Sequence, residues 1–130
     1  MMLLDVARTL VDGAVREAEE AGLRLAVVVL DQTFTVVYAV RMDGAQRSTY
    51  GAAVGKATTA LNFTAPSRVM KERILPENRL SMQIADPALM FIGGGAPLVR
   101  DGVAIGAIGI SGGPEATDAE LAERLAASVG

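Results

Sequence analysis

The hydrophobic positions of the chain change their spacing several times, and each change predicts a new element. Apolar residues recur three and four positions apart from Val6 to Ala18, which predicts a helix over about residues 5–21. Residues 23–30 are almost continuously apolar, and the apolar positions of residues 34–42 alternate. We therefore expect two strands, and the short turn between them makes the pair antiparallel.

A second helix is predicted after this strand pair. Its apolar stripe runs from Tyr50 to Leu61, and Asp43 is expected to cap its N-terminus. Lys56 lies at the border between this stripe and a face of small residues. Residues 62–89 contain three prolines and two short helical patterns, so we expect short helices that cover a site, contact another subunit or simply connect two elements.

Glycine is concentrated in residues 91–113, which hold eight of the fourteen glycines. The Asp101-Gly102 pair separates two apolar runs and predicts a tight β-hairpin, and glycine inside its second strand indicates a closely packed neighbour. Gly93 to Gly95 precede the hairpin and form a loop whose backbone can approach another group closely. This stretch is either a ligand-binding loop or a packing hairpin.

The predicted order of elements is helix, two strands, helix, irregular segment, two strands and helix. A capping box at Thr117 to Glu120 opens the last helix, and Leu89 to Ile92 has room for a short additional strand. Strand pairs separated by helices are typical of an α+β fold with a mostly antiparallel sheet. The 130 residues fit one domain over residues 1–130.

Composition narrows the classes of function. The net charge of −3, the absence of a basic run and an aromatic content of 4% make nucleic acid an unexpected partner. No apolar run approaches the roughly 20 residues of a membrane helix. Hydrophobic residues nevertheless make up 51% of the chain, which indicates apolar surface buried between subunits. The N-terminus lacks the basic segment of a signal peptide, so a cytoplasmic location is expected.

Cysteine and histidine are both absent. Their absence removes disulfides, thiol chemistry, the most common general base and the most common transition-metal ligand. We therefore expect no metal site built from side chains of these types.

Four motifs follow one another along the chain. They are Arg41-Met42-Asp43-Gly44-Ala45, then Gly55-Lys56-Ala57-Thr58-Thr59-Ala60 with Phe63 and Pro66, then Gly93-Gly94-Gly95-Ala96-Pro97, and Gly106-Ala107-Ile108-Gly109-Ile110-Ser111-Gly112. In order and spacing they resemble the GlcG/HbpS haem-binding-protein family, which also includes the C-terminal domain of PduO-type corrinoid proteins. The resemblance covers about residues 3–128.

The resemblance implies a single α+β domain with a five-stranded, mostly antiparallel sheet and helices on both faces, of the profilin or PAS-like kind. It also implies homo-oligomers and the binding of a small molecule, with haem and corrinoid as the ligands of better-known members. Without histidine, only methionine or tyrosine remains as an axial ligand for haem.

Two positions depart from the family pattern. Residues 31–33 lack the glycines that usually join the first two strands, so this hairpin is expected to be longer or differently bent. Near the last helix, Thr117 stands where relatives commonly have glutamine, and only Asp118 carries over.

The first hypothesis is a site for a small ligand that bears a carboxylate or another anion. Successive N–H groups of the glycine loop, Gly93–Gly95, can form an anion-binding nest. The predicted ligand-binding residues are Arg41, Lys56, Phe63, Gly93, Gly94, Gly95 and Ser111. In this hypothesis Gly94→Val abolishes binding and leaves the fold intact, because a Cβ atom blocks the loop.

The second hypothesis is a cofactor-independent isomerase, lyase, cyclase or hydrolase that acts on a small carbonyl compound. Lys56 and Asp43 are its candidate catalytic residues, because acid–base chemistry without histidine or cysteine falls to lysine, tyrosine and carboxylates. The glycine loop would then supply an oxyanion hole. A third hypothesis is a structural oligomer with the glycine hairpin at a subunit interface.

Overall fold

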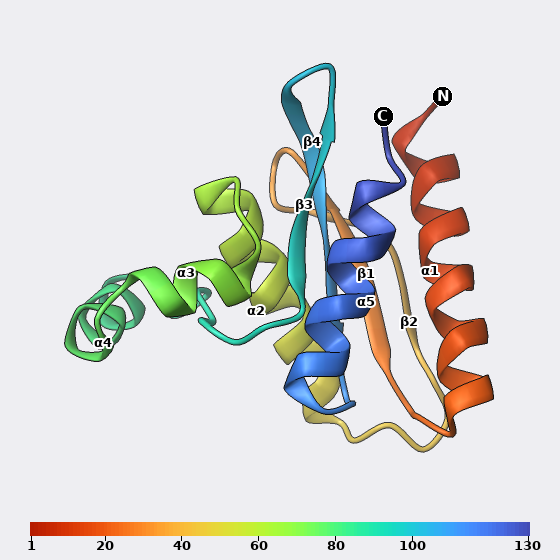
Figure 1. Cartoon of the computed structure of the whole chain (residues 1–130), viewed down its shortest axis with the longest axis horizontal. Coiled ribbons are helices and arrows are strands. Elements are labelled where there is room, and N and C mark those ends of the chain that lie inside the picture. The colour runs from red at the N-terminus through yellow and green to blue at the C-terminus, as the bar shows by residue number, and fades with distance from the viewer.

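Helices cover both faces of a four-stranded antiparallel sheet in the computed structural model, which describes residues 1–130 (Figure 1). The strands pair in the order β2-β1-β4-β3 and comprise β1 (Ala26–Asp31), β2 (Val36–Arg41), β3 (Gly95–Arg100) and β4 (Val103–Ser111). The helices are α1 (Leu3–Ala21), α2 (Ser48–Phe63), α3 (Ser67–Arg73), α4 (Pro76–Ala85) and α5 (Glu115–Ala127). The predicted α+β fold with an antiparallel sheet is confirmed.

Alternation along β1 separates two cores. Val27 and Val29 pack in the core that the sheet shares with α1 and α5, whereas Val28 and Leu30 pack beneath α2. No residue from Ala26 to Leu30 has exposed surface, so the predicted strand covered on both faces is confirmed. Figure 1 shows α1 and α2 on opposite sides of the sheet.

The prediction of five strands is wrong, because residues 89–92 do not join the sheet. Backbone N–H and C=O groups of this segment form hydrogen bonds with side chains instead of with a neighbouring strand. The hydroxyl of Thr59 accepts the N–H of Met90 at 2.7 Å, and the hydroxyl of Ser67 donates to the carbonyl of Ile92 at 2.7 Å. Each bond takes a backbone group that a strand ladder would need.

The turn between β1 and β2 closes without glycine. The carboxylate of Asp31 accepts the N–H of Thr33 at 2.8 Å and its hydroxyl at 2.6 Å, and these bonds lower the pKa of Asp31. Phe34 takes a positive φ of 64°, and the pairing register shifts between Val29 and Leu30. An acidic side chain therefore closes this turn in place of glycine.

Two predicted helix caps are wrong. The helix α2 begins at Ser48, so Asp43 lies several residues before it and does not cap it. The helix α5 begins directly after Pro114, because a proline has no N–H to leave unpaired at a helix start. Asp118 consequently lies in the first turn, where its side chain faces inward instead of forming the expected capping box.

The helices α3 and α4 project from the sheet as an arm, residues 67–85 (Figure 1). The helix α4 buries none of its side chains, and Leu75, Leu80 and Ile84 are 59%, 61% and 74% exposed. The prediction of short helices in this segment is confirmed. None of the helices combines the length and apolar character that crossing a membrane requires.

Candidate functional site

Lys56 lies in the interior, between α2, β4 and α5. Its ammonium donates to the carbonyl oxygen of Ile110 at 2.9 Å and lies 3.5 Å from a carboxylate oxygen of Asp118. Lys56 and Asp118 are 3% and 1% exposed. The amine of Lys56 is therefore paired inside the protein.

Burial has the largest effect on the pKa values of both Lys56 and Asp118. It lowers the pKa of Lys56, and the nearby carboxylate of Asp118 opposes this shift. Burial raises the pKa of Asp118. Two neighbours oppose this shift: the ammonium of Lys56, and the N–H of Gly113, which donates to the carboxylate at 3.2 Å. Each charge is tolerated here because the other is fixed beside it.

The glycine loop lies directly against this pair. A Cβ atom on Gly94, which has a φ of 130°, would overlap the carbonyl oxygen of Ile110 and lie 3.0 Å from the ammonium nitrogen of Lys56. Gly94 therefore permits a close contact between the loop, β4 and α2. The expectation that Gly94→Val leaves the fold intact is wrong, because the site has no room for any side chain.

Two of the three N–H groups of the glycine loop already have acceptors. Gly93 donates to a carboxylate oxygen of Glu115 at 2.9 Å, and Gly95 donates to the hydroxyl of Ser67 at 2.9 Å. The carbonyl of Gly94 accepts the N–H of Ile110 at 2.8 Å. The loop is thus bonded to α3, β4 and α5, and its ligand-binding role stays a prediction.

Glu115 joins the glycine loop to the arm. Its carboxylate also pairs with the ammonium of Lys71 at 2.9 Å. The N–H of Gly93 and then the charge of Lys71 hold the pKa of Glu115 below its ordinary value. This carboxylate therefore stabilises the fold above the ordinary glutamate pKa, and the contribution is lost as pH falls through the lowered value.

We expect Glu115→Gln to lower the free energy of unfolding at neutral pH by about 1 kcal/mol, since a hydrogen bond and an ion pair on a side chain 41% exposed are both weakened. Urea unfolding measures the loss, which should shrink on acidification. Glu120→Gln is the matched control, because Glu120 lies on the same helix and pairs only with the exposed Arg124. Equal losses in the two variants would contradict a special role for Glu115.

The other predicted residues are dispersed. Ser111 is buried at the end of β4 and pairs with Ala26 of β1. Ala26 pairs on its other edge with Arg41 of β2, so one strand separates Ser111 from Arg41. Arg41 donates to the carbonyl of Ala45 at 2.9 Å and, with Asp43, lines a cavity of about 410 Å³ beside the end of α1. The carboxylate that accompanies Lys56 is Asp118 and not Asp43.

Phe63 lies at the end of α2, where its ring centre is 5.9 Å from that of Phe91. Phe91 was not predicted as a site residue, and neither were Ser67, Glu115 and Asp118. For Asp118 a signal was present, because it lies three and four positions before the buried pair Leu121 and Ala122 and so falls on the buried face of the helix. Glu115 and Ser67 each follow a proline at a helix start, which is a weaker signal.

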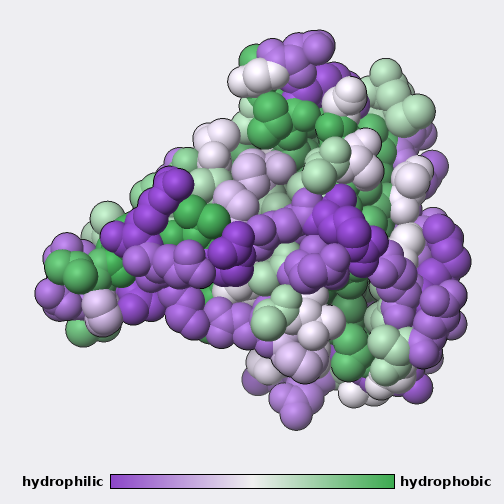
Figure 2. Space-filling view, in the orientation of Figure 1, coloured by the Kyte–Doolittle hydropathy of each residue, from purple (hydrophilic) through white to green (hydrophobic).

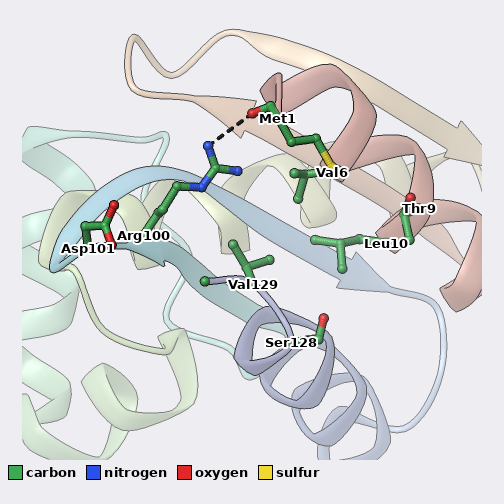
Figure 3. Close-up of a pocket in the computed structure, with 9 residues that line it drawn as sticks. Met1, Val6, Thr9, Leu10, Arg100, Asp101, Ser128 and Val129 are labelled. Atoms are coloured by element: carbon green, nitrogen blue, oxygen red, sulfur yellow. Dashed lines mark hydrogen bonds between the residues drawn. The ribbon is translucent and has the colours of Figure 1, made fainter.

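Two further cavities lie away from the Lys56–Asp118 pair. One, of about 530 Å³, lies between α1, the β3–β4 turn and the last residues of the chain, where Arg100 donates to the carbonyl of Met1 (Figure 3). The other, of about 470 Å³, lies between the arm and the start of α5. Its lining residues are Arg68, Lys71, Glu72, Arg79, Glu115, Ala116 and Ala119.

Known proteins resemble this chain along almost its whole length. A family model described as "Haem degrading protein HbpS-like" matches residues 2–127. The crystal structure of a double mutant of HbpS from Streptomyces reticuli has 30% sequence identity and a TM-score of 0.87, and the match covers 98% of this chain and 86% of that one.

Two further proteins are similar to this chain over more than nine-tenths of its length. The crystal structure of a PduOC:haem complex has 27% identity and a TM-score of 0.84, over 94% of this chain and 90% of that one. A 15.0 kDa protein of Citrobacter freundii, uncharacterised and encoded in the dhaT–dhaS intergenic region, is 27% identical over 122 residues, 92% of this chain and 86% of the relative.

Proposed function

The chain belongs to the HbpS-like family of small-ligand-binding proteins, and from this premise we propose that its ligand is haem or a related tetrapyrrole such as a corrinoid. The observation that carries the proposal is the similarity to the PduOC:haem complex over 94% of this chain. A smaller organic acid is the other ligand class that the sequence suggests.

The side chains of the arm fit an amphipathic ligand of this kind. A tetrapyrrole presents a large apolar face and carries carboxylates at its edge. The helix α4 exposes apolar side chains, and its Arg79 lines a cavity together with the α3 cations Arg68 and Lys71. Figure 2 shows this mixture, with hydrophobic atoms at the tip of the arm among hydrophilic ones. The arm would therefore hold the macrocycle against Leu80 and Ile84.

The axial ligand has to come from a thioether or a phenol, because the chain has no histidine or cysteine. The exposed candidates are Met82 on α4, which lies on the opposite side of that helix from Leu80 and Ile84, and Tyr50 in the first turn of α2. Bound haem would supply a redox-active iron, and these residues would supply its coordination.

Titration with haemin tests the proposal. We expect a saturable change in Soret absorbance at an equimolar ratio, and an affinity at least about tenfold lower in Leu80→Ser/Ile84→Ser, because these side chains would lose apolar contact area. Val103→Ser is the matched control, since Val103 is also an exposed apolar residue but lies in the β3–β4 hairpin.

The spectrum of Met82→Ala distinguishes a coordinating role from a packing role. If Met82 coordinates the iron, the Soret band of this variant should move, whereas loss of a packing contact lowers the affinity and leaves the band in place. Absence of any Soret change with the wild-type protein would rule out haem as the ligand.

We also propose that the protein forms a homo-oligomer. A ten-residue helix without a buried side chain is only marginally stable in water. We therefore expect a second copy of the chain to pack against α4. Sedimentation equilibrium on the wild type and on Leu80→Ser/Ile84→Ser tests this, and a monomer at all concentrations of the wild type would contradict it. The cytoplasmic location expected from the sequence stays a prediction.

A further inference from the structure

The cavity between the arm and the start of α5 is lined mainly by charged side chains. Three cations and two carboxylates surround its volume of about 470 Å³, which lies in the range of small-molecule sites. Two alanines of α5 form an uncharged part of the wall, and their small side chains leave the space open. The positive charges of this wall therefore outnumber its negative charges by one.

Two of the three cations already have carboxylate partners. Arg68 pairs with Glu123 at 2.9 Å and with Glu72 at 3.3 Å, and Lys71 pairs with Glu115 at 2.9 Å. Both carboxylates of the wall are therefore engaged by the cations of α3. The remaining cation is Arg79, which comes from α4.

Arg79 has no such partner. No carboxylate lies within 4.0 Å of its guanidinium, and its Nε atom is buried without any hydrogen-bond partner. It is the one buried side-chain nitrogen or oxygen in the chain that lacks a partner. Because Nε is enclosed by protein, Arg79 offers the cavity that it lines its terminal N–H groups, which also have no carboxylate partner.

We infer that this cavity binds a carboxylate group and that Arg79 is the residue that receives it. A guanidinium presents its N–H groups in a planar fork that matches the two oxygens of a carboxylate. The carboxylate belongs either to the proposed tetrapyrrole, in which case the inference rests on the proposed function, or to a free organic acid, in which case it stands without it.

Calorimetric and Soret titrations of Arg79→Gln test the inference with three probes. They are haemin, its dimethyl ester, in which both carboxylates are blocked, and succinate as a free dicarboxylate. Arg73→Gln is the matched control, because Arg73 is a second arginine of the arm without an ion pair but lies outside the cavity. Arg79→Lys, which keeps the charge and loses the fork, is the second variant, and circular dichroism checks that each protein folds.

If the carboxylate is that of haem, Arg79→Gln should weaken haemin binding by about ten- to a hundredfold, as the loss of a charge-assisted hydrogen bond predicts. Binding of the dimethyl ester should change less than about twofold, and Arg73→Gln should bind both probes like the wild type. Arg79→Lys should fall between Arg79→Gln and the wild type.

The outcomes separate this inference from the proposed function. If the wild type binds succinate through Arg79 and does not bind haemin, the haem proposal fails and the carboxylate site stands. If the wild type binds haemin and its ester equally, Arg79→Gln changes neither and succinate does not bind, haem binding stands and the carboxylate site is refuted. Failure of the wild type to bind haemin and succinate alike also refutes it.

Discussion

Replacing Gly109 with alanine should lower the free energy of unfolding by about 3 kcal/mol, because the new methyl group has no space. Gly109 lies in β4 where α2 rests directly on the backbone of the strand. A Cβ atom there would overlap the carbonyl oxygen of Ala53 and lie 3.0 Å from the side chain of Ala57. The helix would have to move away from the sheet, and the core beneath it would open.

The helix α2 contains its own control for this experiment. Gly51 has nothing within 4 Å of the position of a Cβ atom, so Gly51→Ala should stabilise the protein by about 0.5–1 kcal/mol through the helix preference of alanine. Urea unfolding of the two variants gives opposite signs if packing decides the outcome. A Gly109→Ala protein as stable as the wild type would show that α2 is not held at this distance.

Replacing Lys56 with methionine should destabilise the protein by about 3–5 kcal/mol, which is the usual result of leaving one charge of a buried pair without its partner. Asp118 would keep only the backbone N–H groups of Gly112 and Gly113 as donors. Arg73→Met is the surface control and should change the stability by less than about 0.5 kcal/mol.

The loss in Lys56→Met should depend on pH in a defined direction. Without the ammonium, burial raises the pKa of Asp118 still further above its ordinary value. Between the ordinary and the raised value the folded protein holds a proton that the unfolded chain has released, so stability falls as pH rises through this window. The loss measured by urea unfolding should therefore be larger at about pH 7 than at about pH 4.

A double variant shows whether the two charges act on each other. Lys56→Met/Asp118→Asn removes the unpaired carboxylate, so it should recover a large part of the stability that Lys56→Met loses. No recovery, together with a loss independent of pH, would contradict the buried pair. Recovery would give Lys56 a role as a positioning residue that holds α2, β4 and α5 around the glycine loop.

Local patterns determined most of the elements. The buried strand, the alternating strand, the Asp101-Gly102 hairpin and the short helices of the arm all follow from apolar periodicity and turn residues, and these depend on neighbours in the chain. The errors arose where long-range bonds decide. Residues 89–92 have the composition of a strand, but Thr59 and Ser67 occupy two of the backbone groups that a strand would use.

The sequence by itself identified Lys56 and the glycine loop as neighbours, and the structure places them in contact. Only the tertiary structure decided what fills the space between them, because Asp118, Ser67 and Glu115 reach the loop from helices that are distant in sequence. Likewise, no local pattern shows that Arg79 lacks an acceptor. A missing partner is a property of everything folded around a side chain, and spacing along the chain does not encode it.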